Sequence, residues 1–340
     1  MSMDSLQSQQ ILFNHIKIKL PSHLSLVEEI AEKLNISNDS AYRRIRGEKP
    51  IGLDEIQILC NHYKISLDQL LRIDNDTAIF SGKMVDHTNF NLTHYLHEVL
   101  RTFQFFKSVQ GAEICNFNKD IPIFHFMQFR ELCAFKYFFW KRTLMHYPEL
   151  VKQQFNGEEN DNDVMETGLE IIKLYVQIPS SEIWNDESIH ATIRQIEYYR
   201  QTKSFVNKDI ILKIYGQLED LINHLEIEAE KGLKFLYGET PGENAASYKI
   251  FINECLLGDN TVYMRGKDMQ ATYINHGGMN FISTQDKAFC DYTFYNLQNI
   301  IKKSTPISVA GEKERSMFFN AMREKIYEKK KGITRLNPKV

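Results

Sequence analysis

The residues best suited to chemistry form a short polar stretch between Asn38 and Lys49. It contains four cations and two anions: Arg43, Arg44, Arg46 and Lys49 against Asp39 and Glu48. An asparagine side chain can form paired hydrogen bonds with adenine and an arginine with guanine, while further cations can contact phosphates. Residue types of this kind at this density predict contacts with nucleic acid.

The charge distribution indicates that these cations are more than a solvated helix face. Residues 1–75 carry nine cations against ten anions, and the whole chain of 340 residues has a net charge of −3. Positive charge is therefore local, and any contact with nucleic acid must depend on this stretch rather than on the overall charge.

Short helical patterns surround the cationic stretch and must position it. Residues 5–18 can form a first helix. Ser25 with Glu28 has the pattern of a capping box, and the helix that follows buries Leu26, Ile30, Ala31 and Leu34. A corner at residues 35–37 leads into a helix over residues 39–46, capped by Ser37 or Asn38. Ala41 and Ile45 would face the core, which leaves the arginines mostly outward. Gly47 and Pro50 end this helix, and residues 53–63 and 65–71 complete the unit.

Taken together at their relative spacing, these residues resemble the pattern of the lambda-repressor-like (Xre-type) helix-turn-helix proteins. The resemblance rests on Ile30-Ala31, Leu34, Ile36-Ser37, Gly47, Pro50 and the closing residues 65–71. It covers only the first 70 residues or so, and it departs at Leu26, where the family commonly has a glutamine.

The resemblance implies that the third helix enters the major groove of double-stranded DNA. Residues expected near base edges are Asn38, Asp39, Ser40, Tyr42 and Arg43; Arg44, Arg46 and Lys49 are expected to contact phosphates. A single unit reads few base pairs, so a homodimer on two half-sites is expected. The leading hypothesis is a transcription regulator with a small-molecule or peptide effector. The alternative is an assembly protein that uses the helix-turn-helix to bind another protein.

The expected fold class is mainly α, with three parts. A five-helix DNA-binding domain occupies residues 1–75, followed by a linker over 76–91. A helical dimerisation and effector region follows over 92–238, and a small α+β module with an antiparallel sheet over 245–332. The module is predicted from short runs rich in β-branched and aromatic residues, separated by glycine-containing turns.

An aromatic-rich segment, residues 124–140, could line a pocket for a flat or apolar ligand. The core of a helical subdomain or a dimer interface explains it better. The segment also contains His125, Arg130, Glu131 and Lys136, so no membrane span is expected there.

No pattern in the chain predicts catalysis, a metal or a cofactor. His94, His97 and Glu98 could lie on one helix face, but no further ligand cluster accompanies them, so solvated histidines are expected. His276-Gly277-Gly278 is similar to the oxyanion loop of hydrolases, but the sequence contains no GxSxG motif to supply a nucleophile. Gly266-Lys267 lacks the upstream glycine of a phosphate-binding loop. We therefore expect the protein not to be an enzyme.

The cysteines and the apolar segments predict a cytoplasmic protein. The five cysteines are scattered and form no CxxC pair, as is typical of reduced thiols, and no signal peptide is recognisable.

Overall fold

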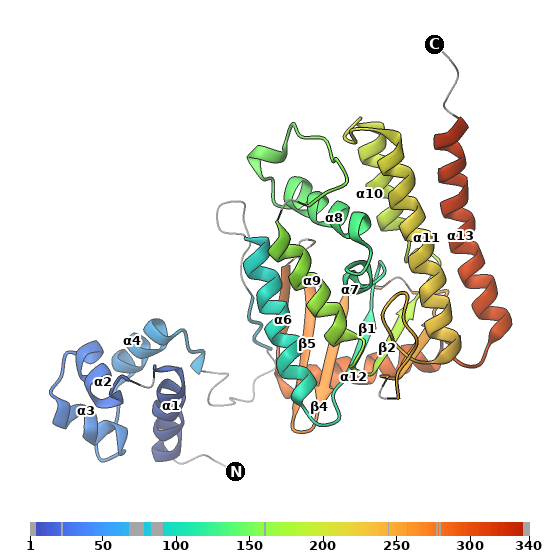
Figure 1. Ribbon diagram of the computed structural model, residues 1–340. Helices are drawn as coiled ribbons and strands as arrows, with labels where there is room; N and C mark the ends of the chain where they lie inside the picture. The colour runs from blue at the N-terminus through green and yellow to red at the C-terminus, as the bar shows by residue number, and fades with distance from the viewer. Residues whose placement is uncertain are drawn as a thin grey trace. The chain divides into compact units, whose positions relative to one another are not determined.

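The computed structural model describes residues 5–21, 23–67, 78–82, 91–159, 161–243, 245–256, 258–276, 278 and 280–335. The chain divides into two compact units, Met1–Ile79 and Phe80–Val340 (Figure 1). Each has its own hydrophobic core. The predicted linker over 76–91 lies largely outside the described residues, as do residues 68–71 of the predicted closing segment.

The first unit consists, within its described residues, of four helices: α1 (Ser5–Lys19), α2 (Leu26–Leu34), α3 (Asn38–Ile45) and α4 (Leu53–Tyr63). Their shared core includes Phe13, Ile30, Ala31, Ala41 and Leu59, all buried. Apolar residues three and four positions apart on each helix meet in this core, which is the pattern expected of small amphipathic helices. The unit therefore has an interior of its own.

The second unit alternates helices and strands through most of its length. In chain order these are α6 (Leu92–Ser108), β1 (Glu113–Phe117), α7 (Ile123–Phe126), α8 (Arg130–Phe139), the π-helical turn η1 (Trp140–Leu144), the 3₁₀ turn η2 (Pro148–Leu150), α9 (Asn162–Tyr175), β2 (Ser180–Trp184), α10 (His190–Gln201), α11 (Lys208–Lys231), β3 (Tyr248–Ile252), β4 (Thr261–Gly266), β5 (Met269–His276), β6 (Asn280–Thr284), α12 (Lys287–Lys302), β7 (Thr305–Pro306) and α13 (Glu312–Arg335).

The strands form one seven-stranded mixed sheet in the order β6-β5-β4-β1-β2-β3-β7. β1, β2 and β3 are parallel neighbours, joined by long helical connections. β4, β5 and β6 form an antiparallel meander that pairs with β1, and β7 pairs antiparallel with β3. The centre of the sheet is therefore parallel and its two edges are antiparallel.

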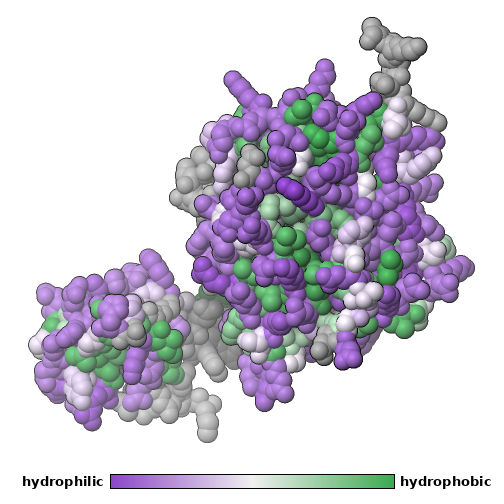
Figure 2. Space-filling view, viewed as in Figure 1, coloured by the Kyte–Doolittle hydropathy of each residue, from purple (hydrophilic) through white to green (hydrophobic). Residues whose placement is uncertain are grey.

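Helices cover both faces of this sheet. Ile114, Trp184 and Ile250 pack with the large helical layer that includes α8, α9 and α11. In Figure 1, α9 crosses in front of the strands. Cys115 and Ile183, which point to the opposite face, pack with α12. Strands buried on both faces are typical of the parallel part of an α/β sheet. Hydrophilic residues cover most of the visible surface (Figure 2).

The predicted fold class is wrong in its account of the sheet. The region expected to be helical, 92–238, contributes β1 and β2, and both pair within the same sheet as the later strands. β3 runs parallel to β2, so the strands after residue 245 do not form a separate antiparallel module. Sequence periodicity missed β1 and β2 because each has five residues and places a polar residue, Asn116 or Glu182, in the buried interior.

The aromatic-rich segment belongs to the core. Phe126, Phe129, Phe135 and Phe138 are buried in one hydrophobic cluster and Tyr137 in a second. None of the described helices is both long and apolar enough to cross a membrane.

Candidate functional site

The corner between α2 and α3 is built as the sequence predicts. Asn35 adopts a left-handed conformation with φ of 52°, and the Ile36 amide donates to the Ala31 carbonyl at 3.0 Å. The Ser37 hydroxyl accepts from the Ser40 amide at 3.2 Å, which caps α3. These local bonds fix the direction in which α3 leaves the corner.

At the start of α2, the predicted capping box is wrong. Ser25 is the N-cap residue, but its side chain accepts no hydrogen bond from the helix. The first turn of α2 contains Glu28 and Glu29, whose negative charges favour a helix N-terminus.

Arg44 points into the first unit rather than towards solvent. Its guanidinium binds the Glu55 carboxylate through Nε at 2.9 Å and Nη2 at 2.7 Å, and it also donates to the Ser40 carbonyl at 3.1 Å. Only 6% of Arg44 is exposed. The expected phosphate contact is therefore corrected: Arg44 joins α3 to α4.

Two partners of Glu55, Arg44 and the Gly52 amide, lower the pKa of its carboxyl group. The Arg44 guanidinium holds the pKa of this carboxyl below its ordinary value, and burial opposes that effect only in part. The carboxylate also accepts from the Gly52 amide at 3.1 Å, at the first turn of α4. The pair thus fixes both the exit from α3 and the start of α4.

Gln9 of α1 fixes the segment after α3, a role that the sequence analysis missed. Its amide donates to the carbonyls of Arg44 at 2.7 Å and Lys49 at 2.8 Å, and its oxygen accepts from the Ile51 amide at 3.0 Å. A glutamine in a helix has no recognisable pattern for such a contact, because its partners lie 35 to 42 residues away.

The remaining candidate residues lie on the outer side of α3 and its exit. Asn38, Asp39, Tyr42, Arg43, Arg46 and Lys49 are exposed and Ser40 is half-buried. Arg46 lies over the Tyr42 ring, 5.5 Å from its centroid, and pairs with Glu48 at 3.3 Å. Among the described residues, the side chains of Arg43 and Lys49 make no hydrogen bond or ion pair. Both are available to a ligand.

The histidines considered for metal binding pair with carboxylates instead. His94 lies 3.2 Å from Glu98, and His97 lies 3.0 Å from Asp163 of α9. The described part of the chain contains no group of His, Cys, Asp and Glu side chains arranged to hold a metal ion. His276 is the last residue of β5, and Gly277 lies outside the described residues.

No model of a protein family, no curated protein and no solved structure matches this chain.

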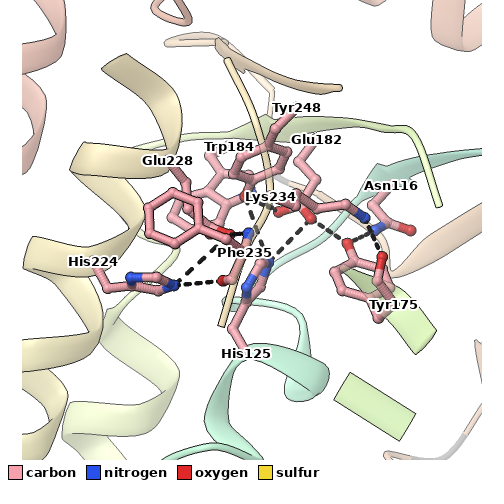
Figure 3. A network of polar contacts seen from close by, with 10 residues as sticks. All are labelled: Asn116, His125, Tyr175, Glu182, Trp184, His224, Glu228, Lys234, Phe235 and Tyr248. Atoms are coloured by element: carbon pink, nitrogen blue, oxygen red, sulfur yellow. Dashed lines mark hydrogen bonds and ion pairs between the residues drawn. The ribbon is translucent and has the colours of Figure 1, made fainter. Parts of the chain in front are cut away.

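A second polar site, which the sequence analysis missed, is buried beneath the helical face of the sheet (Figure 3). Glu182 of β2 is fully buried. One carboxylate oxygen accepts from the Tyr175 hydroxyl and from His125 Nε2, the latter at 3.1 Å. The other accepts from Trp184 Nε1 at 2.9 Å and from the Tyr248 hydroxyl at 3.0 Å. Four donors thus compensate the loss of water around one carboxylate.

The electrostatics of Glu182 follow from these partners. Burial alone would raise the pKa of Glu182, but the charge of His125 and the hydrogen bonds from His125 and Tyr175 outweigh it and lower the pKa. Burial, reinforced by the Glu182 charge, raises the pKa values of Tyr175 and Tyr248 well above their ordinary range. Both phenols are therefore donors at neutral pH.

A second buried carboxylate, Glu228 of α11, has fewer partners. One oxygen accepts from the Phe235 amide at 2.8 Å, while the other has no hydrogen-bond partner among the described residues. Burial raises the pKa of Glu228 to about 8. The same cause lowers the pKa of His224 to about 4 and that of Lys234 to about 7. Glu228 is consequently mostly protonated at neutral pH.

Lys234 and Asn116 connect this region to the centre of the sheet. The Lys234 ammonium donates to the Tyr175 carbonyl at 2.6 Å and lies 3.7 Å from the centroid of the Tyr175 ring. The Asn116 amide donates to the Tyr175 hydroxyl at 3.1 Å. The buried polar network therefore joins β1, β2 and β3 to α7, α9 and α11, and its contacts stabilise the packing of helices on the sheet.

Proposed function

We propose that the protein binds double-stranded DNA sequence-specifically through α3 and regulates transcription. The observation that carries the proposal is the two-sided character of α3. Arg44 and Gln9 fix the helix from inside the unit, while Asn38, Tyr42, Arg43, Arg46 and Lys49 remain exposed. A rigid helix with exposed bidentate side chains suits the major groove.

Each exposed residue has a role that its chemistry supports. Asn38, Asp39, Ser40, Tyr42 and Arg43 lie on or near the first turns of α3 and would contact base edges. Arg46 and Lys49 follow them at the end of the helix and would contact phosphates. Arg44 is not part of this surface, because its guanidinium is bound to Glu55.

Two further parts of the proposal concern assembly and location. One α3 helix reads only a few base pairs, so specific binding requires a homodimer on two half-sites. All five cysteines are free. Free thiols suit a reducing compartment, which supports a cytoplasmic location.

The test is DNA binding by the full chain and by its Arg43→Ala variant. Duplexes selected from a random library by the wild-type protein would be titrated in a gel-shift assay. In the homodimer each protomer loses one bidentate base contact, and each lost contact should weaken binding to the selected duplex by roughly 5- to 150-fold. The base preference should relax at one position of each half-site. A matched control is Arg194→Ala, which removes an exposed arginine of the second unit.

Two outcomes would contradict the proposal. One is the absence of any sequence preference in the selected pool. The other is equal affinity of the wild type and Arg43→Ala for the selected duplex, with the same base preference at every position.

A further inference from the structure

The second unit has a cleft at the carboxyl ends of its parallel strands. The cleft measures about 390 Å³ and is bordered by Phe117 at the end of β1, Asn253 just after β3, and the side of α12. This volume lies within the range of small-molecule sites, which is about 300–1,000 Å³. The carboxyl end of parallel strands is also where open α/β sheets generally bind ligands.

The lining of the cleft combines apolar and polar side chains, and α12 supplies some of each. Phe117, Ile274, Leu297 and Ile300 supply apolar surface. Asn296, Asn299 and Lys303 are spaced by three and four residues, so they lie on one side of the helix. Their side chains make no hydrogen bond or ion pair with another described residue, whereas the Asn253 side chain binds the Cys255 and Leu256 amides.

The charges in the lining limit the ligand class. Lys303 is its cation and Asp259 its anion, and the Asp259 carboxylate already accepts from the Thr261 amide at 3.0 Å. A single available cation beside two amides suits a monoanion, and a phosphate with two charges would be repelled by Asp259. The apolar part of the lining suits a hydrocarbon or aromatic body.

One residue of the lining connects the cleft to the start of the second unit. The Phe289 ring meets the Phe80 ring edge to face, with centroids 5.0 Å apart. The next residue, Ser81, exchanges two backbone hydrogen bonds of 2.7 Å with Ser283 of β6. We call residues 80–82 the anchor. Because the first unit ends at Ile79, the anchor is where the chain leaves the second unit towards the DNA-binding helices.

The anchor fits closely against the sheet. A Cβ atom on Gly82 would lie 2.6 Å from Ile282 Cγ2 and 3.3 Å from Ile282 Cα, so only glycine allows this approach. Ile282 is paired with Ile274, which lines the cleft. The anchor and the cleft therefore share two structural neighbours, Phe289 and the β5–β6 pair.

We propose that the cleft binds a small monocarboxylate with an apolar body, and that its occupancy stabilises the anchor through Phe289 and Phe80. An effect of the ligand on DNA affinity, transmitted through the anchor, rests on the proposed DNA-binding function. Binding of the monocarboxylate in the cleft, which we call the binding half of the inference, does not. The carboxylate is placed at Lys303 and Asn299, and the apolar body lies against Leu297, Ile300 and Phe289.

Binding is tested on the full chain with n-octanoate as the probe and n-octylamine as its charge-reversed match. Isothermal titration should show octanoate binding more tightly than octylamine. Lys303→Met should weaken octanoate binding roughly tenfold, the effect of losing one charge-assisted hydrogen bond. Lys302→Met, an adjacent exposed lysine outside the cleft, should leave it unchanged. Asn296→Trp, which fills the cleft, should abolish binding.

The binding half is overturned by any of three results. These are no octanoate binding by the wild type, octylamine binding as tight as octanoate, or equal losses in Lys303→Met and Lys302→Met. Unfolding midpoints of all variants, followed by tryptophan fluorescence, separate a misfolded variant from one that has lost only the ligand.

The coupling is tested by hydrogen exchange at the anchor. Octanoate at ten times its Kd should slow exchange of the Ser81 amide roughly tenfold if opening of the anchor releases the ligand. Phe80→Ala should still bind octanoate but lose this protection and any effect of octanoate on DNA affinity. Unchanged Ser81 exchange in the wild type would overturn the coupling. A wild-type protein that binds octanoate but no DNA would refute the proposed function and leave the cleft assignment standing.

Discussion

Two adjacent arginines, Arg43 and Arg44, have different physical roles. Arg44 lies three residues after the buried Ala41, which places both on the inner side of α3. Its guanidinium forms a bidentate pair with Glu55, while Arg43 is exposed. Arg44 therefore joins α3 to α4, and its guanidinium is not exposed to a ligand. The spacing to Ala41 was available in the sequence, but the partner Glu55 was not identifiable from it.

The Arg44→Met variant should loosen α3 within a folded chain. Removing the guanidinium leaves the Glu55 carboxylate in a site where only 22% of its side chain is exposed. Breaking a fully buried pair costs about 3–5 kcal/mol, so we expect about 2 kcal/mol for this partly exposed one. Amide hydrogen exchange of α3 should accelerate accordingly. Arg44→Met combined with Glu55→Met should recover much of the loss.

The pH dependence provides the internal control for this pair. The pKa of Glu55 is lower in the folded state than its ordinary 4.5, so its contribution is fully present above about pH 4.5. It is lost as the pH falls through the folded pKa. Exchange of α3 should therefore accelerate with falling pH more in the wild type than in Arg44→Met, after correction for intrinsic exchange. Parallel pH profiles would show that the pair does not stabilise α3.

At the level of elements, the corner between α2 and α3 was predicted from local contacts, although the equally local capping box at Ser25 does not form. The corner at Asn35–Ser37 depends on residues within five positions of each other: the Ile36 amide donates to the Ala31 carbonyl, and the Ser37 side chain accepts from the Ser40 amide. The strands β1 and β2 depend on distant contacts. Two of the four donors that stabilise Glu182 in the interior, His125 and Tyr248, are 57 and 66 residues away. No local pattern contains that information.

Substitution of Glu182 tests whether the buried polar network joins the helices to the sheet. Glu182→Leu leaves the donors of His125, Tyr175, Trp184 and Tyr248 without their acceptor, and each unsatisfied buried group costs about 1–3 kcal/mol. We expect the second unit to lose at least about 3 kcal/mol. Glu182→Gln, which retains one acceptor oxygen, should lose less. Both tryptophans of the chain, Trp140 and Trp184, lie in the second unit, so urea unfolding followed by tryptophan fluorescence reports on that unit.

A stability within about 0.5 kcal/mol of the wild type in Glu182→Leu would contradict this role, since that is the range of surface substitutions. The reverse order, with Glu182→Gln less stable than Glu182→Leu, would show that the misplaced amide donor matters more than the missing acceptor. A matched control is Ser181→Ala, at the neighbouring position of β2.

At the level of the whole molecule, the charge of the chain allows DNA binding to be distinguished from protein docking. The net charge of the chain is −3, so its overall field repels DNA. The exposed cations available on and after α3 are Arg43, Arg46 and Lys49. Any attraction to phosphate must therefore come from about three side chains per protomer, and the rest of the surface opposes it.

Because the available cations are few, the salt dependence of the DNA-binding constant K can be predicted as a number. If each of the three replaces a counterion, log K should fall with log[KCl] with a slope of about −3 for a monomer and about −5 for a homodimer on two half-sites. Fluorescence anisotropy of a labelled selected duplex from 50 to 200 mM KCl would measure it. Lys49→Met should reduce the dimer slope by about 2, one counterion for each protomer, while Lys302→Met should leave it unchanged. A slope near zero would favour the use of the helix-turn-helix as a protein-docking module, and a slope of about −3 would contradict the dimer.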